Sequence, residues 1–198
     1  MKSIDVKGTL RTETGKKSTR ELRKSDSVPC VLYGLKKDEN GNQVATHFAV
    51  TNSELRNLVY TPNIYVVNLT IDGQACKAVL KDIQFHPVKD TILHVDFYEV
   101  TEEKPIIMEV PVQLNGLAAG VRAGGKLQAQ VRKLKVKALY TAIPEKLNVD
   151  VTALELGKSI KCAELSFEGL ELVTPAEVVV CSVRMTRAAR GAAAAAGK

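Results

Sequence analysis

The segment that decides the fold is Ile92-Leu93-His94-Val95-Asp96-Phe97-Tyr98-Glu99-Val100. Successive residues of a β-strand point to opposite faces, so this alternation predicts a strand with two different surfaces. One face carries Leu93, Val95, Phe97 and Glu99, and the other carries Ile92, His94, Asp96 and Tyr98. Neither His94 nor Asp96 is needed to fill a core, which makes the polar face a candidate functional surface.

The same strand-like pattern fills the rest of the first hundred residues. Runs rich in β-branched residues, separated by Gly, Asn and Asp, predict strands and hairpin turns. The strands are expected near 4–10, 28–33, 44–50, 64–71 and 74–85, with turns at 36–42 and 72–73. Ser18-Thr19-Arg20-Glu21 and Thr51-Asn52-Ser53-Glu54 match helix capping boxes and predict two short helices, at about 19–25 and from 51 to before Pro62.

A domain boundary is expected at 101–105, which is charged, lacks apolar residues and ends in proline. Beyond it, Pro111 predicts an edge strand at 106–114, and the glycines of 115–125 predict a long flexible hairpin loop. A phase change at Arg132-Lys133 predicts a β-bulge within a strand at 127–139. Strands are also expected at 147–151 and at 178–183, the latter in a central position.

Composition excludes several classes of protein. The chain has no Trp, no apolar run of transmembrane length and no secretory signal at its start, which predicts a cytoplasmic protein without a membrane partner. The cysteines at 30, 76, 162 and 181 and the histidines at 47, 86 and 94 lack metal-ligand spacing. We therefore expect buried reduced thiols, no metal, no cofactor and no small-molecule substrate.

Positive charge is concentrated at the start of the chain. Residues 1–37 carry ten Lys or Arg against four acids, a net +6 that equals the net charge of the whole protein. Residues 38–100 sum to −4, and 101–183 balance ten bases with ten acids. Such a cluster suits a phosphate-rich partner, although a solvated surface is an equally good interpretation of charge alone. The Arg, Ala and Gly tail after Arg184 has nothing to bury and is expected to be disordered.

Four separated motifs resemble one known family, in the right order along the chain. They are Arg11-x-x-x-Gly15-Lys16-x-x-x-Arg20-x-Leu22-Arg23, Val28-Pro29-Cys30-Val31-Leu32-Tyr33-Gly34, Lys81-Asp82-Ile83-Gln84-Phe85-His86-Pro87 and Leu93-His94-Val95-Asp96-Phe97. The family is that of the bacterial large-subunit (50S) ribosomal protein twenty-five, in its long two-domain form, called Ctc or general stress protein, which binds 5S rRNA.

The resemblance implies a mainly β fold. Residues 1–99 are expected to form a six-stranded β-barrel with short helices that binds 5S rRNA, 100–185 a smaller all-β domain, and 186–198 the basic Ala-rich tail. By position, the RNA contacts of the family fall on Arg11, Lys16, Arg20, Arg23, Tyr33, Lys81, His94 and Asp96. Glu21 and Phe85 stand where many or some relatives have arginine, so two contacts of the family are in question here.

The resemblance implies a structural protein that binds the loop E region of 5S rRNA and helps form the central protuberance. Neighbouring rRNA and ribosomal proteins are the other expected partners. A free-standing stress-related protein that binds structured RNA is the alternative. A third hypothesis is an enzyme that uses His94 and Asp96 as an acid/base pair, because residues two apart on a strand share a face. No nucleophile or cofactor motif accompanies that pair, so we expect no enzyme.

Overall fold

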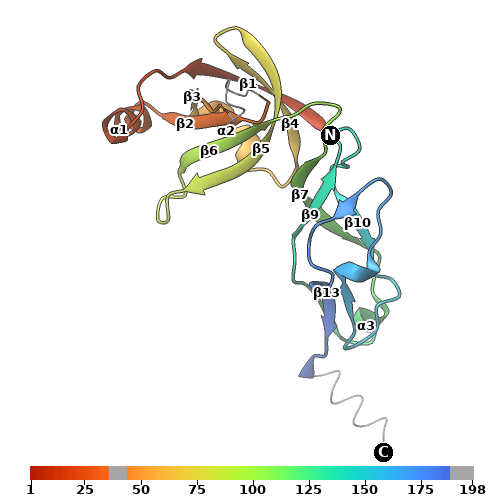
Figure 1. The fold of residues 1–198 in the computed structure, drawn as a ribbon. Helices are drawn as coiled ribbons and strands as arrows, with labels where there is room; N and C mark the ends of the chain where they lie inside the picture. Colours follow the sequence, from red (N-terminus) through yellow and green to blue (C-terminus); the bar gives the residue numbers. More distant parts are fainter. Residues whose placement is uncertain (36–43, 188–198) are drawn as a thin grey trace, which may run out of the picture. The chain divides into compact units, whose positions relative to one another are not determined.

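The computed structural model describes residues 1–35 and 44–187, and Figure 1 shows its fold. The chain separates into two compact units. The first comprises Met1–Lys104 together with Leu139–Thr141, and the second comprises Pro105–Ala138 and the residues from Ala142 on. The predicted turn at 36–42 and the tail from 188 lie outside the described residues. That each unit is an independently folding domain stays a prediction.

A closed β-barrel forms the first unit, as predicted. Within the described residues, six strands follow one another around it in the order β1-β3-β2-β6-β5-β4, and a parallel β1–β4 pair closes the ring. The strands are β1 Lys2–Leu10, β2 Ser27–Tyr33, β3 Thr46–Thr51, β4 Tyr65–Ile71, β5 Gln74–Phe85 and β6 Ile92–Glu99. The short helices are α1 Lys16–Lys24 and α2 Asn52–Val59.

Strand alternation fills the barrel with apolar side chains. The parallel register of β2 with β6 sets Leu32 beside Phe97, and that of β1 with β4 sets Val6 beside Leu69. The rings of Phe48 and Phe97 meet in the interior with their centroids 5.8 Å apart. Burial of these side chains is the main stabilising contribution, at roughly 1.5–3 kcal/mol for each large apolar residue.

The prediction of two capping boxes was wrong. Helix α1 begins at Lys16, after Gly15 with φ 130, so Ser18 lies inside the helix and its hydroxyl donates to the carbonyl of Glu13. Helix α2 does begin where the sequence predicted, after Thr51, but no side chain caps it. The carboxylate of Glu54 instead accepts a hydrogen bond from the backbone N–H of Lys7, because a tertiary partner competes for it.

The second unit is also built of strands, as predicted. One sheet has the order β10-β7-β9-β12 and the other the order β11-β13-β8. Their bounds are β7 Ile106–Asn115, β8 Lys126–Ala129, β9 Lys133–Ala138, β10 Leu147–Asp150, β11 Ser159–Lys161, β12 Glu171–Leu172 and β13 Val179–Arg184. Helix α3 spans Ala119–Arg122, and a 3-10 turn covers Cys162–Glu164. Strand β13 is central in its sheet, as expected.

Pro111 does not mark an edge strand, which corrects the prediction. Strand β7 lies between β9 and β10. Its first part, to Pro111, pairs with β9, whereas its last part, from Val112, pairs with β10. The proline sits where the pairing changes from one neighbour to the other, so its missing N–H leaves no gap in either ladder.

Two further predictions for this unit were wrong. The segment 115–125 is not a hairpin loop, since β7 does not pair with β8 and the connection contains helix α3. The phase change at Arg132-Lys133 is not a bulge within one strand either. It marks the break between β8 and β9, which belong to different sheets. Each strand keeps its own alternation of apolar residues. The phase changes at Arg132-Lys133 because the chain passes there from one sheet to the other.

The four cysteines are free thiols. Cys30, Cys162 and Cys181 are buried, as predicted, whereas Cys76 is only half-buried. Burial raises the pKa of the Cys30 thiol to about 12, and the negative charge of Asp96 contributes to this rise. The positive charge of Arg11 and a hydrogen bond with the backbone of Val50 act in the opposite direction. This thiol therefore stays protonated and behaves as a small apolar side chain.

Candidate nucleic-acid interface

The outer surface of β2, β6 and β5 is the polar face predicted from the sequence. Register places Asp96 of β6 between Val31 of β2 and Asp82 of β5. The Nδ1 atom of His94 lies 2.8 Å from Oδ1 of Asp96, and their side chains are 25% and 32% exposed. The predicted pairing of these two residues on one face is therefore confirmed.

The contact between His94 and Asp96 has a chemical consequence. A carboxylate at Nδ1 fixes the orientation of the imidazole ring, which leaves Nε2 for another partner. The second carboxylate oxygen of Asp96 has no hydrogen-bond donor within residues 1–35 and 44–187. The pair thus presents an oriented imidazole nitrogen and a hydrogen-bond acceptor, the groups that read ribose hydroxyls and base edges.

Two β-bulges flank this pair, and neither was predicted from the sequence. Along β5, the register passes from Leu80 opposite Phe97 to Asp82 opposite Asp96, so Lys81 is the extra residue. Along β6, it passes from His94 opposite Gln84 to Ile92 opposite Phe85, so Leu93 is extra. Bulges redirect side chains and free backbone groups next to functional sites.

The bulge at Leu93 also corrects the predicted faces of β6. Ile92 was expected on the polar face with His94, but it is buried in the barrel core with Val95 and Phe97. One extra residue reverses the alternation, so Ile92 and Val95 point to the same side although they are three apart. Leu93 is only half-buried. The signal that could have revealed this bulge is the apolar Ile92 on an otherwise polar face.

Tyr33 extends the polar face along β2. Its ring meets Tyr98 of β6 edge to face, with centroids 5.8 Å apart and planes at 72°. Partial burial raises the pKa of the Tyr33 hydroxyl, and the nearby charges of Asp96, Asp82 and Tyr98 raise it further. The hydroxyl therefore remains a proton donor at neutral pH, able to bond phosphate or a base acceptor.

Arg23 attaches helix α1 to this face. Its Nε and Nη2 atoms donate to the carbonyl of Leu93 at 3.1 and 2.8 Å. This carbonyl belongs to the bulged residue, so the arginine fork satisfies an acceptor that the ladder leaves out. Part of the Arg23 guanidinium thus has a structural role that was not predicted from the sequence, although the residue as a whole is exposed.

The rest of the basic helix carries exposed cations. Lys16, Lys17, Arg20 and Lys24 are exposed, and none forms an ion pair with a carboxylate in the described part of the chain. The first turn contains no acid, and no side chain caps it. Its free N–H groups, the positive end of the helix dipole and Lys16 together favour an anion there.

Arg11 is the most enclosed of the predicted contact residues. Its backbone N–H donates to the carbonyl of His47, and its Nη2 donates to the carbonyl of Glu13 at 3.2 Å. Its Nε is buried without a hydrogen-bond partner. Arg11 therefore holds the start of the link to α1 and is only half-exposed, whereas Lys81 is exposed at its bulge.

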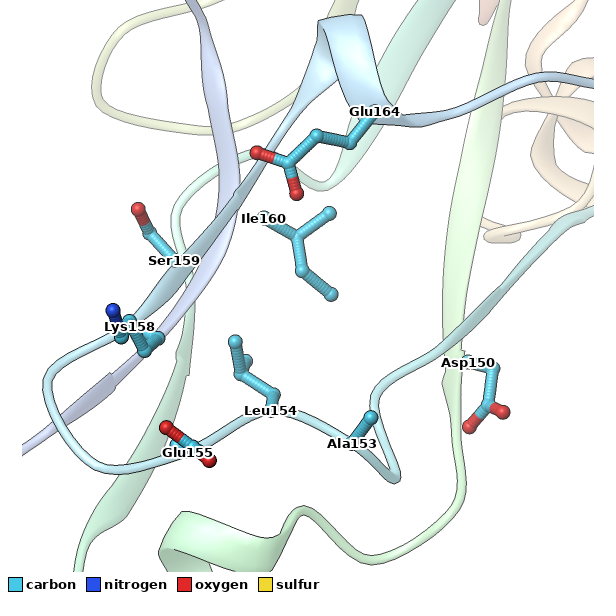
Figure 2. A pocket seen from close by; sticks show the side chains of 8 residues that line it. All are labelled: Asp150, Ala153, Leu154, Glu155, Lys158, Ser159, Ile160 and Glu164. Atoms are coloured by element: carbon cyan, nitrogen blue, oxygen red, sulfur yellow. The ribbon is translucent and has the colours of Figure 1, made fainter.

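A pocket of about 420 Å³ lies in the second unit and contains none of the predicted contact residues (Figure 2). Its charged lining residues are Asp150, Glu155, Glu164 and Lys158. Three carboxylates against one lysine disfavour phosphate, so this pocket does not suit RNA. In the described part of the chain, no group of His, Cys, Asp and Glu could hold a metal ion, and no helix could span a membrane.

Comparison with known proteins gives matches over both units. Residues 6–97 match the model of the Ribosomal L25p family, and 105–187 match that of the Ribosomal protein TL5, C-terminal domain. The chain is 70% identical to the large ribosomal subunit protein bL25 of Phocaeicola vulgatus over the full length of both proteins. It is 65% identical to that of Bacteroides thetaiotaomicron over the full length of both, and 54% identical to that of Porphyromonas gingivalis over 98% of each.

Proposed function

The chain belongs to the Ribosomal L25p family of large-subunit proteins, and on this premise we propose that it binds the loop E region of 5S rRNA through α1 and the polar face. As a member of this family it is a structural protein of the ribosome and not an enzyme. The proposal adds a specific RNA partner and a specific surface. It also assigns the protein to the central protuberance, among neighbouring rRNA and ribosomal proteins.

One observation carries the proposal: a helix with unpaired cations and the oriented His94–Asp96 pair are fixed to the same strand. Arg23 holds α1 to the carbonyl of Leu93, next to His94 in β6. A flexible basic segment would bind any polyanion, because phosphate contacts carry no sequence information. Cations held beside an imidazole and a carboxylate support the recognition of one RNA with a particular three-dimensional structure.

The predicted contact residues divide into two roles. Lys16 and Arg20 would neutralise phosphates, and Lys81 would do so from its bulge. Tyr33, His94 and Asp96 would contact ribose and base edges. Arg11 and Arg23 would act at the junction, where each already bonds a backbone carbonyl and retains exposed or charged groups toward RNA. These assignments remain predictions.

Footprinting of 5S rRNA with the full-length protein tests the proposal. We expect saturable protection of the loop E nucleotides and much weaker protection of a structured RNA of similar size and unrelated sequence. Equal protection of both RNAs would support the alternative, a general binder of structured RNA. Sedimentation separates the same hypotheses in cells, because a ribosomal component stays with the large subunit in moderate salt.

A further inference from the structure

Two aromatic rings are exposed together where β5 ends. Tyr60 directly follows α2, Phe85 is the last residue of β5, and they are 52% and 43% exposed. Their centroids lie 6.2 Å apart with the planes tilted by 55°. The barrel fully buries Phe48 and Phe97, so it does not lack room in its core for aromatic side chains. The exposed pair therefore needs another explanation.

The surrounding backbone holds the two rings in place. The Tyr60 hydroxyl donates to the carbonyl of Asp90 at 2.7 Å. Nδ1 of His86 accepts the backbone N–H groups of Val88 and Lys89, both at 3.2 Å. These bonds brace the turn between β5 and β6 against the end of α2, so two segments far apart in sequence present one fixed aromatic surface.

The charges around the pair favour an anionic partner. Arg56 lies one helical turn before Tyr60, so their side chains share a side of α2, and Lys89 lies in the adjoining turn. Neither cation forms an ion pair with a carboxylate within residues 1–35 and 44–187. Asp90 is the opposing charge in the turn. Val88, 85% exposed, is the aliphatic neighbour there.

We propose that Tyr60 and Phe85 form a stacking platform for one unpaired RNA base. The platform lies next to the polar face at the end of the barrel, because Gln84 pairs with His94 on the polar face while the following residue, Phe85, pairs with the core residue Ile92 beyond the bulge at Leu93. Aromatic faces accept any base by stacking, and flanking cations hold the adjoining phosphates. This inference rests on the proposed function and adds to it a contact with a base that lies outside a helix.

An introduced tryptophan tests the platform directly, because the chain has no Trp. Phe85→Trp places a single indole on the platform of the full-length protein. Titration with 5S rRNA should quench its emission in parallel with binding, since a base stacked on the indole is in contact with the fluorophore. Leu117→Trp, at a 53% exposed position of the second unit, is the control and should keep its emission.

Affinity variants separate stacking from apolar docking. Tyr60→Ala and Phe85→Leu should each weaken 5S rRNA binding by about fivefold to a hundredfold, since stacking on an aromatic ring contributes about 1–3 kcal/mol per base. Tyr60→Phe keeps the ring but loses the hydrogen bond to Asp90, so it should weaken binding less than Tyr60→Ala does. Both rings are exposed, so these changes leave the barrel core intact.

The outcomes distinguish the platform from the proposed function. If the wild-type protein fails to bind 5S rRNA, both proposals are overturned. If it binds, while Phe85→Trp emission stays constant at saturation and Phe85→Leu binds normally, the platform alone is overturned. That result would indicate that the patch binds an apolar segment of a neighbouring protein, because leucine packs against such a segment as well as phenylalanine does.

Discussion

Helix α1 and strand β9 carry the same kinds of side chain in two different electrostatic settings. Strand β9 carries Lys133, Lys135 and Lys137 on one side, the first two exposed and Lys137 half-buried. Lys135 Nζ lies 3.9 Å from Glu109 of β7, and Lys137 Nζ lies 3.0 Å from Glu171 of β12. On α1, the described carboxylates leave Lys16, Arg20 and Lys24 without ion pairs.

The difference lies in what the neighbouring strands contribute. Cross-strand neighbours place glutamates opposite the lysines of β9, which cancels their field although such exposed pairs add little stability. Helix α1 has no strand beside its exposed side to supply such acids. The sequence adds to this difference, since residues 1–37 carry a net +6, whereas residues 101–183 are neutral. Basic residues indicate an RNA surface only where the fold leaves their charge uncompensated.

Charge reversal on α1 should have the largest effect on RNA binding, and the same reversal on β9 should have almost none. Lys16→Glu combined with Arg20→Glu should lower 5S rRNA affinity at least about a hundredfold, because two phosphate contacts are lost and two repulsions are gained. The slope of log affinity against log salt should also fall by about two units. Filter binding over a salt series measures both quantities.

Lys135→Glu combined with Lys137→Glu is the matched control, with the same change of net charge. It should leave 5S rRNA affinity within about twofold of wild type, since every proposed RNA contact lies in the first unit. An equal loss in both double variants would mean that net charge, and not the position of α1, determines binding.

Asp96→Asn should have the next largest effect and tests an acid of the polar face. It exchanges an acceptor oxygen beside His94 for a donor while preserving shape. We expect about tenfold weaker RNA binding, or roughly 1.4 kcal/mol, from the mismatch with a base amino group, whereas simple repulsion between Asp96 and RNA predicts tighter binding. Calorimetric titration gives the sign.

Glu109→Gln in β7 is the control for Asp96→Asn, because it removes an exposed carboxylate that faces Lys135. Its RNA affinity should match that of wild type. Thermal unfolding should show unchanged stability for Asp96→Asn, since the pair is partly exposed and lies outside the core. Equal or tighter RNA binding by Asp96→Asn would remove Asp96 from the recognition surface.

Local patterns predicted much of this molecule. The alternation in residues 92–100 gave a strand with His94 and Asp96 on one face, and the structure brings them to 2.8 Å. Alternation depends on adjacent residues, so it placed His94 and Asp96 correctly, but it failed at Ile92, where the pairing of β6 with β5 adds a bulge. The barrel itself followed from the motifs that resemble a family, because alternation does not determine which strands pair.

Features that depend on distant partners escaped prediction. The acceptor of Arg23 is the carbonyl of Leu93, and that carbonyl is available because of a bulge set by the pairing of β5 with β6. Pro111 appeared to mark an edge, since nothing local shows that β7 exchanges one neighbour for another at this residue. The glutamates opposite β9 likewise come from other strands. Each requires knowledge of pairing register.

The smallest expected effect concerns the ion pair of Lys137 with Glu171. Glu171→Gln should lower the free energy of unfolding by less than about 1 kcal/mol, because the side chains of Lys137 and Glu171 are 43% and 67% exposed and water screens the pair. The loss should vanish near 1 M salt, where the Debye length is about 3 Å. Chemical denaturation at low and high salt measures it. Glu168→Gln, which removes an exposed acid of the same segment without an ion-pair partner among the described residues, is the control.

The same Glu171→Gln variant tests why the lysines of β9 do not bind RNA. The reason is either their ion pairs with glutamates or their location in the fold. The variant leaves Lys137 without its partner at 3.0 Å, so this region becomes locally more like α1. If position dominates, 5S rRNA affinity and its salt slope stay at the wild-type values, because no phosphate lies within reach of the released charge. A tighter affinity with a steeper salt slope would show instead that β9 contacts RNA once its acids are removed. The difference between the two elements would then be one of degree, set by the glutamates, and not of location in the fold.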